Sequence, residues 1–478
     1  METKQTSPSP AAAATVIQNE VVDSFRAGMR GAVLRPGDHG YDEARRVWSG
    51  MIDKRPALIA RCTGAADVIA AVNFAREHNL LVAVHGGGHN VAGHATCDGG
   101  LMIDLSPMKG IHIDPRRHTA QAQGGTTWGD LDRETQVFGL AAPGGVVSTT
   151  GIAGLTLGGG YGWLRRKYGL SCDNLLSIDI VTADGRLLTA SETDNAELFW
   201  AIRGGGGNFG VVTSFEYQLH PVGPLVMFLA VMYPARQAQT ILPAWRDVMA
   251  TAPDEFSSNA LFLSIPETPM LPAQVHGQRV FAVVGMYAGA VEEGQRFVQP
   301  LRELAEPLFD LSGPMPYTVV QSLLDSFYPA HQYLHYWKSL YLNHLDEEAI
   351  ATLTDWADNR PAGHGSIDLW AMGGAASRVG ADATALGDRS APFTLVWNTT
   401  WSDPNESEKN IAWTRACYQA MQPYSPGRSY LNFPGFGEEG DELVRMAYGP
   451  NYDRLVRIKN SYDPSNLFRL NQNIKPAV

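Results

Sequence analysis

Three histidines around a run of glycines are the first residues whose types and spacing could do chemistry. His85 and His89 flank residues 86–88, which are all glycine, and His94 follows. Two histidines four apart bind a metal when they share a helix face, but three consecutive glycines disfavour a helix. We therefore expect no metal site. The favoured interpretation is a tight loop after a strand at 81–84, which presents a neutral imidazole as a nucleophile for covalent attachment of a ligand.

Glycine is concentrated in one part of the chain. The sequence has 49 glycines, and 26 of them fall in residues 86–210. Glycine is costly to order, and it is used where the backbone approaches a neighbour closely or turns with positive φ. This concentration predicts a large ligand held mainly by main-chain N–H groups. The alternative is a set of tight turns in a β-rich region.

The elements expected before residue 220 are short strands and helices, with a long glycine-rich loop at 139–162. Apolar periodicity and turn residues predict their limits. The predicted helices cover 65–78, 127–138 and 196–203, and the predicted strands 56–62, 81–84, 101–105, 111–113, 119–122, 175–182, 186–189 and 209–219. The first two strands and the helix between them predict a βαβ unit.

Composition changes after His220-Pro221-Val222-Gly223-Pro224. Between about 225 and 430 glycine thins out and aromatic residues increase. Strand-like runs alternate with helical stretches there, which predicts an α+β domain with an antiparallel sheet. The strand-like runs are 226–233, 260–265, 280–287, 367–372 and 393–399, and the helical stretches are 237–252, 292–305, 346–357 and 407–421, with one more at 451–459.

Charge and cysteine content exclude several classes of protein. Lys and Arg number 37 and Asp and Glu 49, for a net charge of −12, so the basic patch of a nucleic-acid-binding protein is missing. The four cysteines are far apart and form no CxxC, which excludes a zinc module and predicts a reducing, cytoplasmic location. Residues 1–16 have no apolar core and are interpreted as a tail rather than a signal peptide. No stretch stays apolar long enough to span a bilayer.

One apparent dinucleotide motif fails on its context. The sequence of residues 205–210 matches the pattern G-x-G-x-x-G, but a dinucleotide-binding site with this pattern needs a strand before it and a helix after it. Here a helix is predicted before it and a strand after it, so we reject a Rossmann site. The chain also has no lysine-bearing phosphate loop, which argues against ATP or GTP turnover.

Several blocks together resemble a known family. Residues 84–89 resemble the flavin-attachment loop of the vanillyl-alcohol-oxidase (PCMH-type) FAD-binding superfamily, specifically the berberine-bridge-enzyme-like oxidases. The string GIAGLTLGGGYG at 151–162 resembles the second flavin loop of that family. Residues 204–213 resemble the pieces that line adenosine and diphosphate, and 448–474 the C-terminal block. The blocks occur in the family's order and span most of the chain.

The resemblance implies an α+β fold. We expect a PCMH-type FAD-binding domain of two α+β subdomains at 17–220, and a substrate-binding domain at 221–434 whose antiparallel sheet is covered by helices. The segment 435–478 is expected to return to the FAD domain. The implied cofactor is FAD, linked covalently through His89. The implied cofactor-binding residues are His85, Gly86, Gly87, Gly88, His89, Asn90, Gly93, Val147, Ser148, Thr150, Gly151, Gly154, Leu155, Gly159, Gly160, Tyr161, Asp173, Asn174, Gly205, Gly206, Asn208, Phe209, Gly210, Val211, Val212, Asn471 and Asn473.

Two residues depart from the family pattern. Many members form a second flavin bond through a cysteine, but Val147 stands at that place, so no cysteinyl link is expected. The arginine common before the glycines is His85 here, which changes the electrostatics around the attachment site. Thr150 matches a position that influences oxygen access in relatives, and its small side chain favours an oxidase.

The resemblance also implies a base and a substrate pocket. Tyr430 and Asn432 resemble the family's Y-x-N-[YF] segment, whose tyrosine often acts as general base. His335 and Lys338 are of residue types that could help Tyr430 to lose its proton. A phenol of ordinary pKa about 10 needs such help near neutral pH; the alternative is a buried tyrosine that anchors a loop. Aromatic-rich segments predict the pocket, with candidates His335, Trp337, Lys338, Trp370 and Trp397.

The sequence therefore predicts an FAD-dependent oxidase. It would take hydride from a C–H beside an O–H or N–H of a sugar, an alkaloid-like amine or a secondary-metabolite alcohol. Hydride would pass to flavin N5, and O2 would reoxidise the flavin and give H2O2. The alternatives are an FAD-dependent dehydrogenase with another electron acceptor, and a non-redox binding protein or isomerase with the flavin fold. The expected partners are the small substrate and O2, with no nucleic acid and no membrane.

Overall fold

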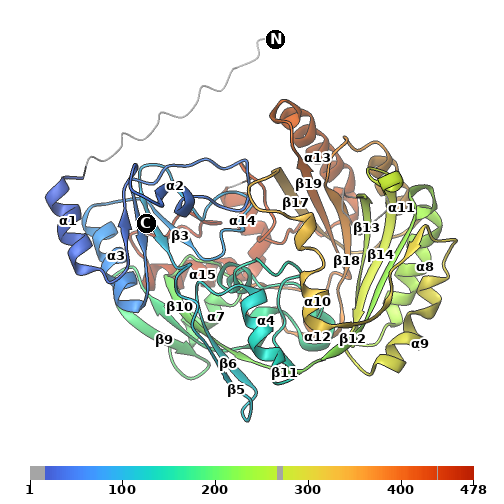
Figure 1. The fold of residues 1–478 in the computed structure, drawn as a ribbon, viewed down its shortest axis with the longest axis horizontal. Helices are drawn as coiled ribbons and strands as arrows, with labels where there is room; N and C mark the ends of the chain where they lie inside the picture. Colours follow the sequence, from blue (N-terminus) through green and yellow to red (C-terminus); the bar gives the residue numbers. More distant parts are fainter. Residues whose placement is uncertain (1–16, 266–272, 439, 478) are drawn as a thin grey trace.

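The computed structural model describes residues 17–265, 273–438 and 440–477. The tail predicted at residues 1–16 lies outside them. Three main sheets make up the molecule, as Figure 1 shows, with the two built from the N-terminal half on one side and the largest on the other. The fold is α+β, as predicted.

The first sheet has four strands in the order β1-β2-β4-β3. Strands β2, β4 and β3 run parallel and β1 is antiparallel to β2. The predicted βαβ unit is present as β2, α3 and β3, but β4 lies between its two strands. The bounds are β1 Val33–Leu34, β2 Leu58–Arg61, β3 Val82–His85 and β4 Leu101–Asp104, with helices α1 Asn19–Gly28, α2 Tyr41–Ala44 and α3 Ala65–Glu77.

The second sheet has five antiparallel strands in the order β5-β6-β10-β8-β9. Its apolar face packs on helices α4, α5 and α7, with Trp128 and Trp200 buried between them. The strands are β5 Ile111–Asp114, β6 Thr119–Gln123, β8 Leu175–Val181, β9 Leu187–Ser191 and β10 Val211–Gln218, and the helices are α4 Trp128–Gln136, α5 Ile152–Leu157, α6 Arg165–Tyr168 and α7 Ala196–Ile202; a small pair joins β7 Leu140–Ala141 to β11 His220–Pro221.

The third sheet is antiparallel and has eight strands, in the order β15-β12-β14-β13-β18-β19-β17 with β16 paired to β12. Helices α8, α9, α11 and α13 cover its outer face (Figure 1). The strands are β12 Leu225–Pro234, β13 Phe256–Ser264, β14 Arg279–Tyr287, β15 Phe309–Asp310, β16 Gly313–Pro316, β17 Leu334–Leu342, β18 Ser366–Ala371 and β19 Phe393–Trp401. The helices are α8 Ala238–Thr251, α9 Val291–Arg302, α10 Tyr317–Ser322, α11 Glu347–Asp358, α12 Gly374–Arg378 and α13 Ser407–Met421.

The C-terminal helices lie away from the third sheet. Helices α14 (Asp441–Tyr448) and α15 (Tyr452–Tyr462) place Val444, Tyr452 and Leu455 in the core that the second sheet forms. This packing supports the proposed return of residues 435–478 to the N-terminal half of the molecule.

Two predicted segments differ from the structure. The loop predicted at 139–162 contains helix α5, which has Gly154 inside it. The aromatic segment 331–338 leads into strand β17, which was not predicted. Both faces of β17 are largely buried, so its sequence lacks the polar and apolar alternation that identifies a strand with one face in water.

Candidate functional site

A cavity of about 670 Å³ lies where the N-terminal sheets meet the third sheet. Its walls come from the glycine-rich loops at 86–90, 145–158 and 204–212, from residues 468–472, and from the inner face of the third sheet. Cavities of this size accommodate ligands up to the size of a cofactor or drug molecule. The predicted ligand-binding loops and the predicted substrate domain therefore share one cavity.

The loop after β3 forms the part of the cavity next to the N-terminal sheets. Gly88 has a φ of +69°, a conformation that glycine adopts without strain. A Cβ on Gly87 would lie 2.3 Å from the backbone nitrogen of Gly151, and a Cβ on Gly88 would lie 2.8 Å from the ring of His85. The glycines thus bring two loops together at backbone distance, while His85 packs beneath the loop and does not line the cavity.

His89 projects into the cavity at the end of this loop. Its Nε2 lies 3.0 Å from the hydroxyl of Thr149 and its Nδ1 lies 3.4 Å from the hydroxyl of Thr150. Burial, with the nearby ring of His85, lowers the pKa of His89 to about 3. The imidazole is therefore neutral at physiological pH, and a neutral imidazole keeps the lone pair that a nucleophile needs.

Trp48 covers His89, and sequence reasoning missed it. The indole stacks on His89 with ring centres 5.3 Å apart and on His335 with centres 3.9 Å apart. Its Nε1 donates to the carbonyl of Tyr328 at 2.8 Å. This places His335 behind Trp48 rather than in the cavity lining. A lone tryptophan in an irregular segment carries no signal in the sequence that would assign it to this site.

Polar groups line the end of the cavity formed by residues 204–212 and 468–472. Asn208 donates to the carbonyls of Gly205 and Gln472 and accepts from the N–H of Ile474 at 2.9 Å, so it joins these two segments. The side-chain oxygens of Asn471 and Gln472 are buried and accept no hydrogen bond from any described residue. A glycine cradle with two unpartnered amide oxygens at one end fits a dinucleotide, whose base and ribose need hydrogen-bonding partners.

The opposite wall is the inner face of the third sheet. Alternate residues of five strands face the cavity: Phe228, Ala230 and Met232 from β12, Asn259, Leu261 and Leu263 from β13, Ala282 and Val284 from β14, Ser366, Asp368 and Trp370 from β18, and Val396 and Asn398 from β19. Most are apolar. Among the described residues that line the cavity, Asp368 is the only carboxylate, and no lysine or arginine is present.

Asp368 is 4% exposed. Its Oδ2 accepts from Asn398 Nδ2 at 2.6 Å, and its Oδ1 accepts no hydrogen bond from the described part of the chain. Burial raises the pKa of Asp368 to about 7, and the polar side chains of Ser366, Asn398 and Trp370 hold this pKa below the value that burial alone would give. An acidic residue between apolar neighbours in a predicted strand was the available sequence signal, although it was not used to assign a role.

The structure does not favour Tyr430 as the general base. Tyr430 is 1% exposed and does not line the cavity. Its hydroxyl accepts from the N–H of Gly160 at 2.8 Å and from Asn432 Nδ2 at 2.7 Å, and burial raises its pKa. A phenol buried without a cation beside it does not become phenolate near neutral pH. The geometry fits the alternative role, in which Tyr430 anchors the loop at Gly160.

Two of the predicted pocket residues lie on the wrong face of the third sheet. Lys338 and Trp397 are cross-strand neighbours, and both point away from the cavity. Lys338 pairs with Glu438 at 2.5 Å, and the indole of Trp397 donates to Cys417 in the core beneath α13. Side chains alternate between the two faces of a strand, so Trp337, one residue from Lys338, does line the cavity, as Trp370 does.

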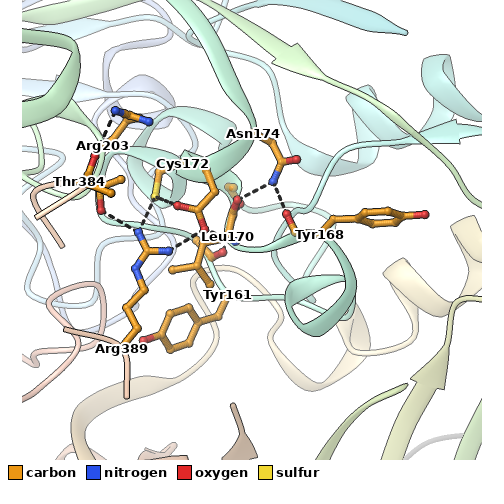
Figure 2. A network of polar contacts seen from close by, with 12 residues as sticks. Tyr161, Tyr168, Leu170, Cys172, Asn174, Arg203, Thr384 and Arg389 are labelled. Atoms are coloured by element: carbon orange, nitrogen blue, oxygen red, sulfur yellow. Dashed lines mark hydrogen bonds and ion pairs between the residues drawn. The ribbon is translucent and has the colours of Figure 1, made fainter. Parts of the chain in front are cut away.

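Neither Asp173 nor Asn174 lines the cavity. Asn174 belongs to the polar network of Figure 2, and Asp173 pairs with Arg389 of the same network. The amide of Asn174 donates to the carbonyls of Tyr168 and Leu170, and Arg389 donates to Asp173 at 2.6 Å and to Thr384 at 2.7 Å. Their hydrogen-bonding groups are used within the protein. The prediction that they contact the cofactor does not fit this arrangement.

The other predicted residues divide into two groups. Those that line the cavity are Gly86, Gly87, Gly88, His89, Asn90, Val147, Thr150, Gly151, Gly154, Leu155, Tyr161, Gly206, Asn208, Gly210, Val211, Val212, Asn432 and Asn471. Those that do not are His85, Gly93, Ser148, Gly159, Gly160, Gly205, Phe209 and Asn473. The second group borders the same loops and shapes them from behind.

Two family patterns match the sequence. The family described as "FAD binding domain" matches residues 56–191, and the family described as "Berberine and berberine like" matches residues 429–475. The first match contains the His89 loop and most of the second sheet, and the second contains Tyr430 and the C-terminal helices. The fold and the matches together define the class of the protein as an FAD-linked oxidoreductase.

Relatives match over nearly the whole chain. An FAD-linked oxidoreductase of Dictyostelium discoideum is 31% identical, with 96% of this chain and 97% of that protein covered. The (R)-6-hydroxynicotine oxidase of Paenarthrobacter nicotinovorans is 34% identical, with 94% and 97% covered. The chain belongs to the berberine-bridge-enzyme-like FAD-linked oxidoreductases of the PCMH type.

Solved structures agree with this assignment. The 6-hydroxy-D-nicotine oxidase of Arthrobacter nicotinovorans has a TM-score of 0.83 at 31% identity and covers 94% of this chain and 98% of its own. A chitooligosaccharide oxidase has a TM-score of 0.84 at 23% identity, which shows a shared fold only. No described helix is both long and apolar enough to cross a membrane.

Proposed function

We propose that this protein is an FAD-dependent oxidase of a small organic substrate, with the flavin attached covalently to His89. The observation that carries the proposal is the shared cavity, which joins the glycine cradle and His89 to the inner face of the third sheet. A ligand fixed at His89 would extend along the cradle and leave the sheet side free for a second molecule.

The residues present fit FAD. The close approach of Gly87 and Gly151 leaves no room for a Cβ, as expected of loops that bind a large ligand through main-chain N–H groups. When bound, FAD accepts hydride from a C–H beside nitrogen or oxygen and passes the electrons to O2, with H2O2 as product. The oxidase named among the relatives at 34% identity supports an oxidase rather than a dehydrogenase.

The chain's own residues would prepare the attachment and protect the site. The hydroxyls of Thr149 and Thr150 hold the neutral imidazole of His89 in one orientation. Trp48 covers one face of that ring, and the apolar side chains of the third sheet exclude water from the substrate side. Four unpaired, buried cysteines support a reducing and hence cytoplasmic location.

The test of this proposal combines flavin extraction with oxygen consumption. The purified protein should be yellow, and acid precipitation should leave the flavin with the polypeptide; His89→Ala should release it. His85→Ala is the matched control and should keep the flavin attached. Anaerobic mixing with an oxidisable substrate should bleach the flavin, and air should restore it with one H2O2 for each substrate. Bleaching without H2O2 in air would indicate a dehydrogenase, and flavin retained by His89→Ala would show another attachment residue.

A further inference from the structure

We propose that the substrate is an apolar organic amine, and that Asp368 binds its protonated nitrogen and accepts a proton from it. The proposal rests on the proposed function, because an oxidase of this kind needs its substrate C–H beside a nitrogen or an oxygen. Sugars, alcohols and amines are the three candidate substrate classes, and the inner face of the third sheet distinguishes among them.

The composition of the wall argues against a sugar. Strands β12, β13 and β14 present Phe228, Met232, Leu261, Leu263 and Val284 to the cavity, with Asn259 as the polar residue that these strands add to its lining. A sugar carries a hydroxyl on almost every carbon, and burying a hydroxyl without a hydrogen-bond partner is costly. The wall instead fits a substrate that is mostly hydrocarbon or aromatic.

Asp368 distinguishes an amine from an alcohol. Asp368 lines the cavity, and its buried Oδ1 has no hydrogen-bond partner among the described residues. A neutral alcohol would leave the ionised carboxylate buried without a counter-charge, which is unfavourable. An ammonium group brings that counter-charge and forms a charge-assisted hydrogen bond to the free oxygen. The arrangement therefore selects a cation of apolar character.

Among residues 17–265, 273–438 and 440–477, no cationic side chain is paired with Asp368. Its partners on the flanking strands are Leu261 on β13 and Val396 on β19. The buried guanidinium of Arg165, which lies over Trp370, donates to the carbonyls of Ala371, Gly162 and Ser258 and to Asn259. The charge of Asp368 helps to raise the pKa of Tyr328, which also lines the cavity. The other titratable residues among the described lining are His89, His94, Tyr161, His364 and Tyr448.

The proton balance is simple. The substrate enters as R2CH–NH2R′⁺, and one N–H proton passes to the carboxylate of Asp368, which gives the neutral amine and a carboxylic acid. Only the neutral amine has a nitrogen lone pair that can form a C=N bond as hydride leaves the adjacent carbon. Because burial raises the pKa of Asp368 to about 7, the carboxyl is a better proton acceptor than an exposed aspartate would be.

The experiment compares matched ligands by titration calorimetry under argon, so that binding is measured without turnover. The panel pairs amines with ethers of the same shape, led by 4-phenylpiperidine and 4-phenyltetrahydropyran, and includes cellobiose as the sugar. We expect the amine to bind at least about tenfold more tightly than its ether, which corresponds to about 1.4 kcal/mol. Asp368→Asn should abolish this preference, whereas Asp355→Asn, which removes an exposed carboxylate on α11, should keep it.

A pH series adds a second readout. Amine binding by the wild-type protein should strengthen as the pH rises through about 7, because Asp368 ionises while the amine stays protonated; Asp368→Asn should show no such rise. Equal binding of amines and ethers across the panel, tighter binding of cellobiose, or an unchanged preference in Asp368→Asn would overturn the proposal. The bleaching and H2O2 measurements described above are independent of these titrations, so failure of the oxidase assignment would be recognised separately.

Discussion

At the scale of single residues, the site depends on two side chains with opposite surroundings. His89 is kept neutral by burial and held by two threonine hydroxyls. Asp368 lies in the mostly apolar wall that the third sheet forms, and its Oδ1 has no hydrogen-bond partner in the described part of the chain. His89 was predicted from the glycine run and the family resemblance. The role of Asp368 was not, because the sequence does not show which face of a strand borders a cavity.

Tyr430→Phe tests whether Tyr430 accepts the substrate proton. The variant removes the acceptor of the Gly160 N–H and of the Asn432 amide, which should lower the free energy of unfolding by about 1–3 kcal/mol. The rate of anaerobic flavin reduction should fall by less than about tenfold, since loss of a general base costs about 10²–10⁴-fold. Stopped-flow absorbance and urea unfolding measure the two effects.

The control for this variant is Tyr341→Phe, which removes the hydroxyl that contacts Tyr161 and leaves Tyr430 in place. If Tyr430→Phe lowers the rate of flavin reduction by about 10²–10⁴-fold without a change in stability, Tyr430 is the general base that the sequence predicted.

At the scale of elements, most helices and strands could be predicted and their contacts could not. Helix α13 was predicted with the bounds that it has, Ser407–Met421, because its apolar residues recur at helical spacing. Strand β17 was missed because burial on both faces removes the alternation. Without that strand, the sides of Trp337 and Lys338 could not be assigned. Helix α5 was predicted as loop because glycine disfavours helix in its interior, although neighbouring contacts keep it helical here.

The glycine cradle gives a prediction at this scale. Gly87→Ala places a Cβ 2.3 Å from the backbone of Gly151, so it should lower both stability and flavin content. A Cβ at Gly154 would meet no atom within 4 Å, and the residue lies inside a helix. Gly154→Ala should therefore raise the free energy of unfolding by about 0.5–1 kcal/mol relative to the wild-type protein. Its new methyl group borders the cavity, so flavin content should fall.

The measurements are thermal unfolding and the ratio of flavin to protein absorbance. Full flavin content in both variants would contradict the assignment of this cavity end to the cofactor. Equal stability of the two variants would contradict the close packing of the two loops.

At the scale of the whole molecule, buried polar contacts hold the third sheet and its loops against the N-terminal half. Arg165 on α6 donates to residues of β13 and to Ala371 at the end of β18. Arg389, in the loop before β19, pairs with Asp173 (Figure 2). The cavity lies at this junction, so its two walls depend on contacts between segments far apart in the sequence. For this reason the sequence predicted many of the residues that line the cavity but not the arrangement of its two walls.

Arg389→Met tests the contribution of this junction. Both side chains of the Arg389–Asp173 pair are nearly inaccessible, at 4% and 10% exposure, and removing one partner of a buried pair leaves an uncompensated charge. We expect a loss of about 3–5 kcal/mol in the free energy of unfolding, measured in urea. Adding Asp173→Asn to Arg389→Met should recover part of it.

The control is Arg186→Met, which breaks the exposed pair with Asp184 and should cost at most about 1 kcal/mol. Similar losses for the buried and exposed pairs would show that Arg389 does not stabilise the junction.

Attachment of the flavin to His89 is tested most directly by mass spectrometry of proteolytic peptides. Trypsin cleaves after Arg76 and after Lys109, and the peptide between them contains His78, His85, His89 and His94. We predict that this peptide carries the mass of FAD, or of the flavin portion that survives digestion, and that fragmentation places it on His89. Flavin found on another histidine of this peptide or on any other peptide, or an unmodified peptide from a fully yellow preparation, would contradict the account.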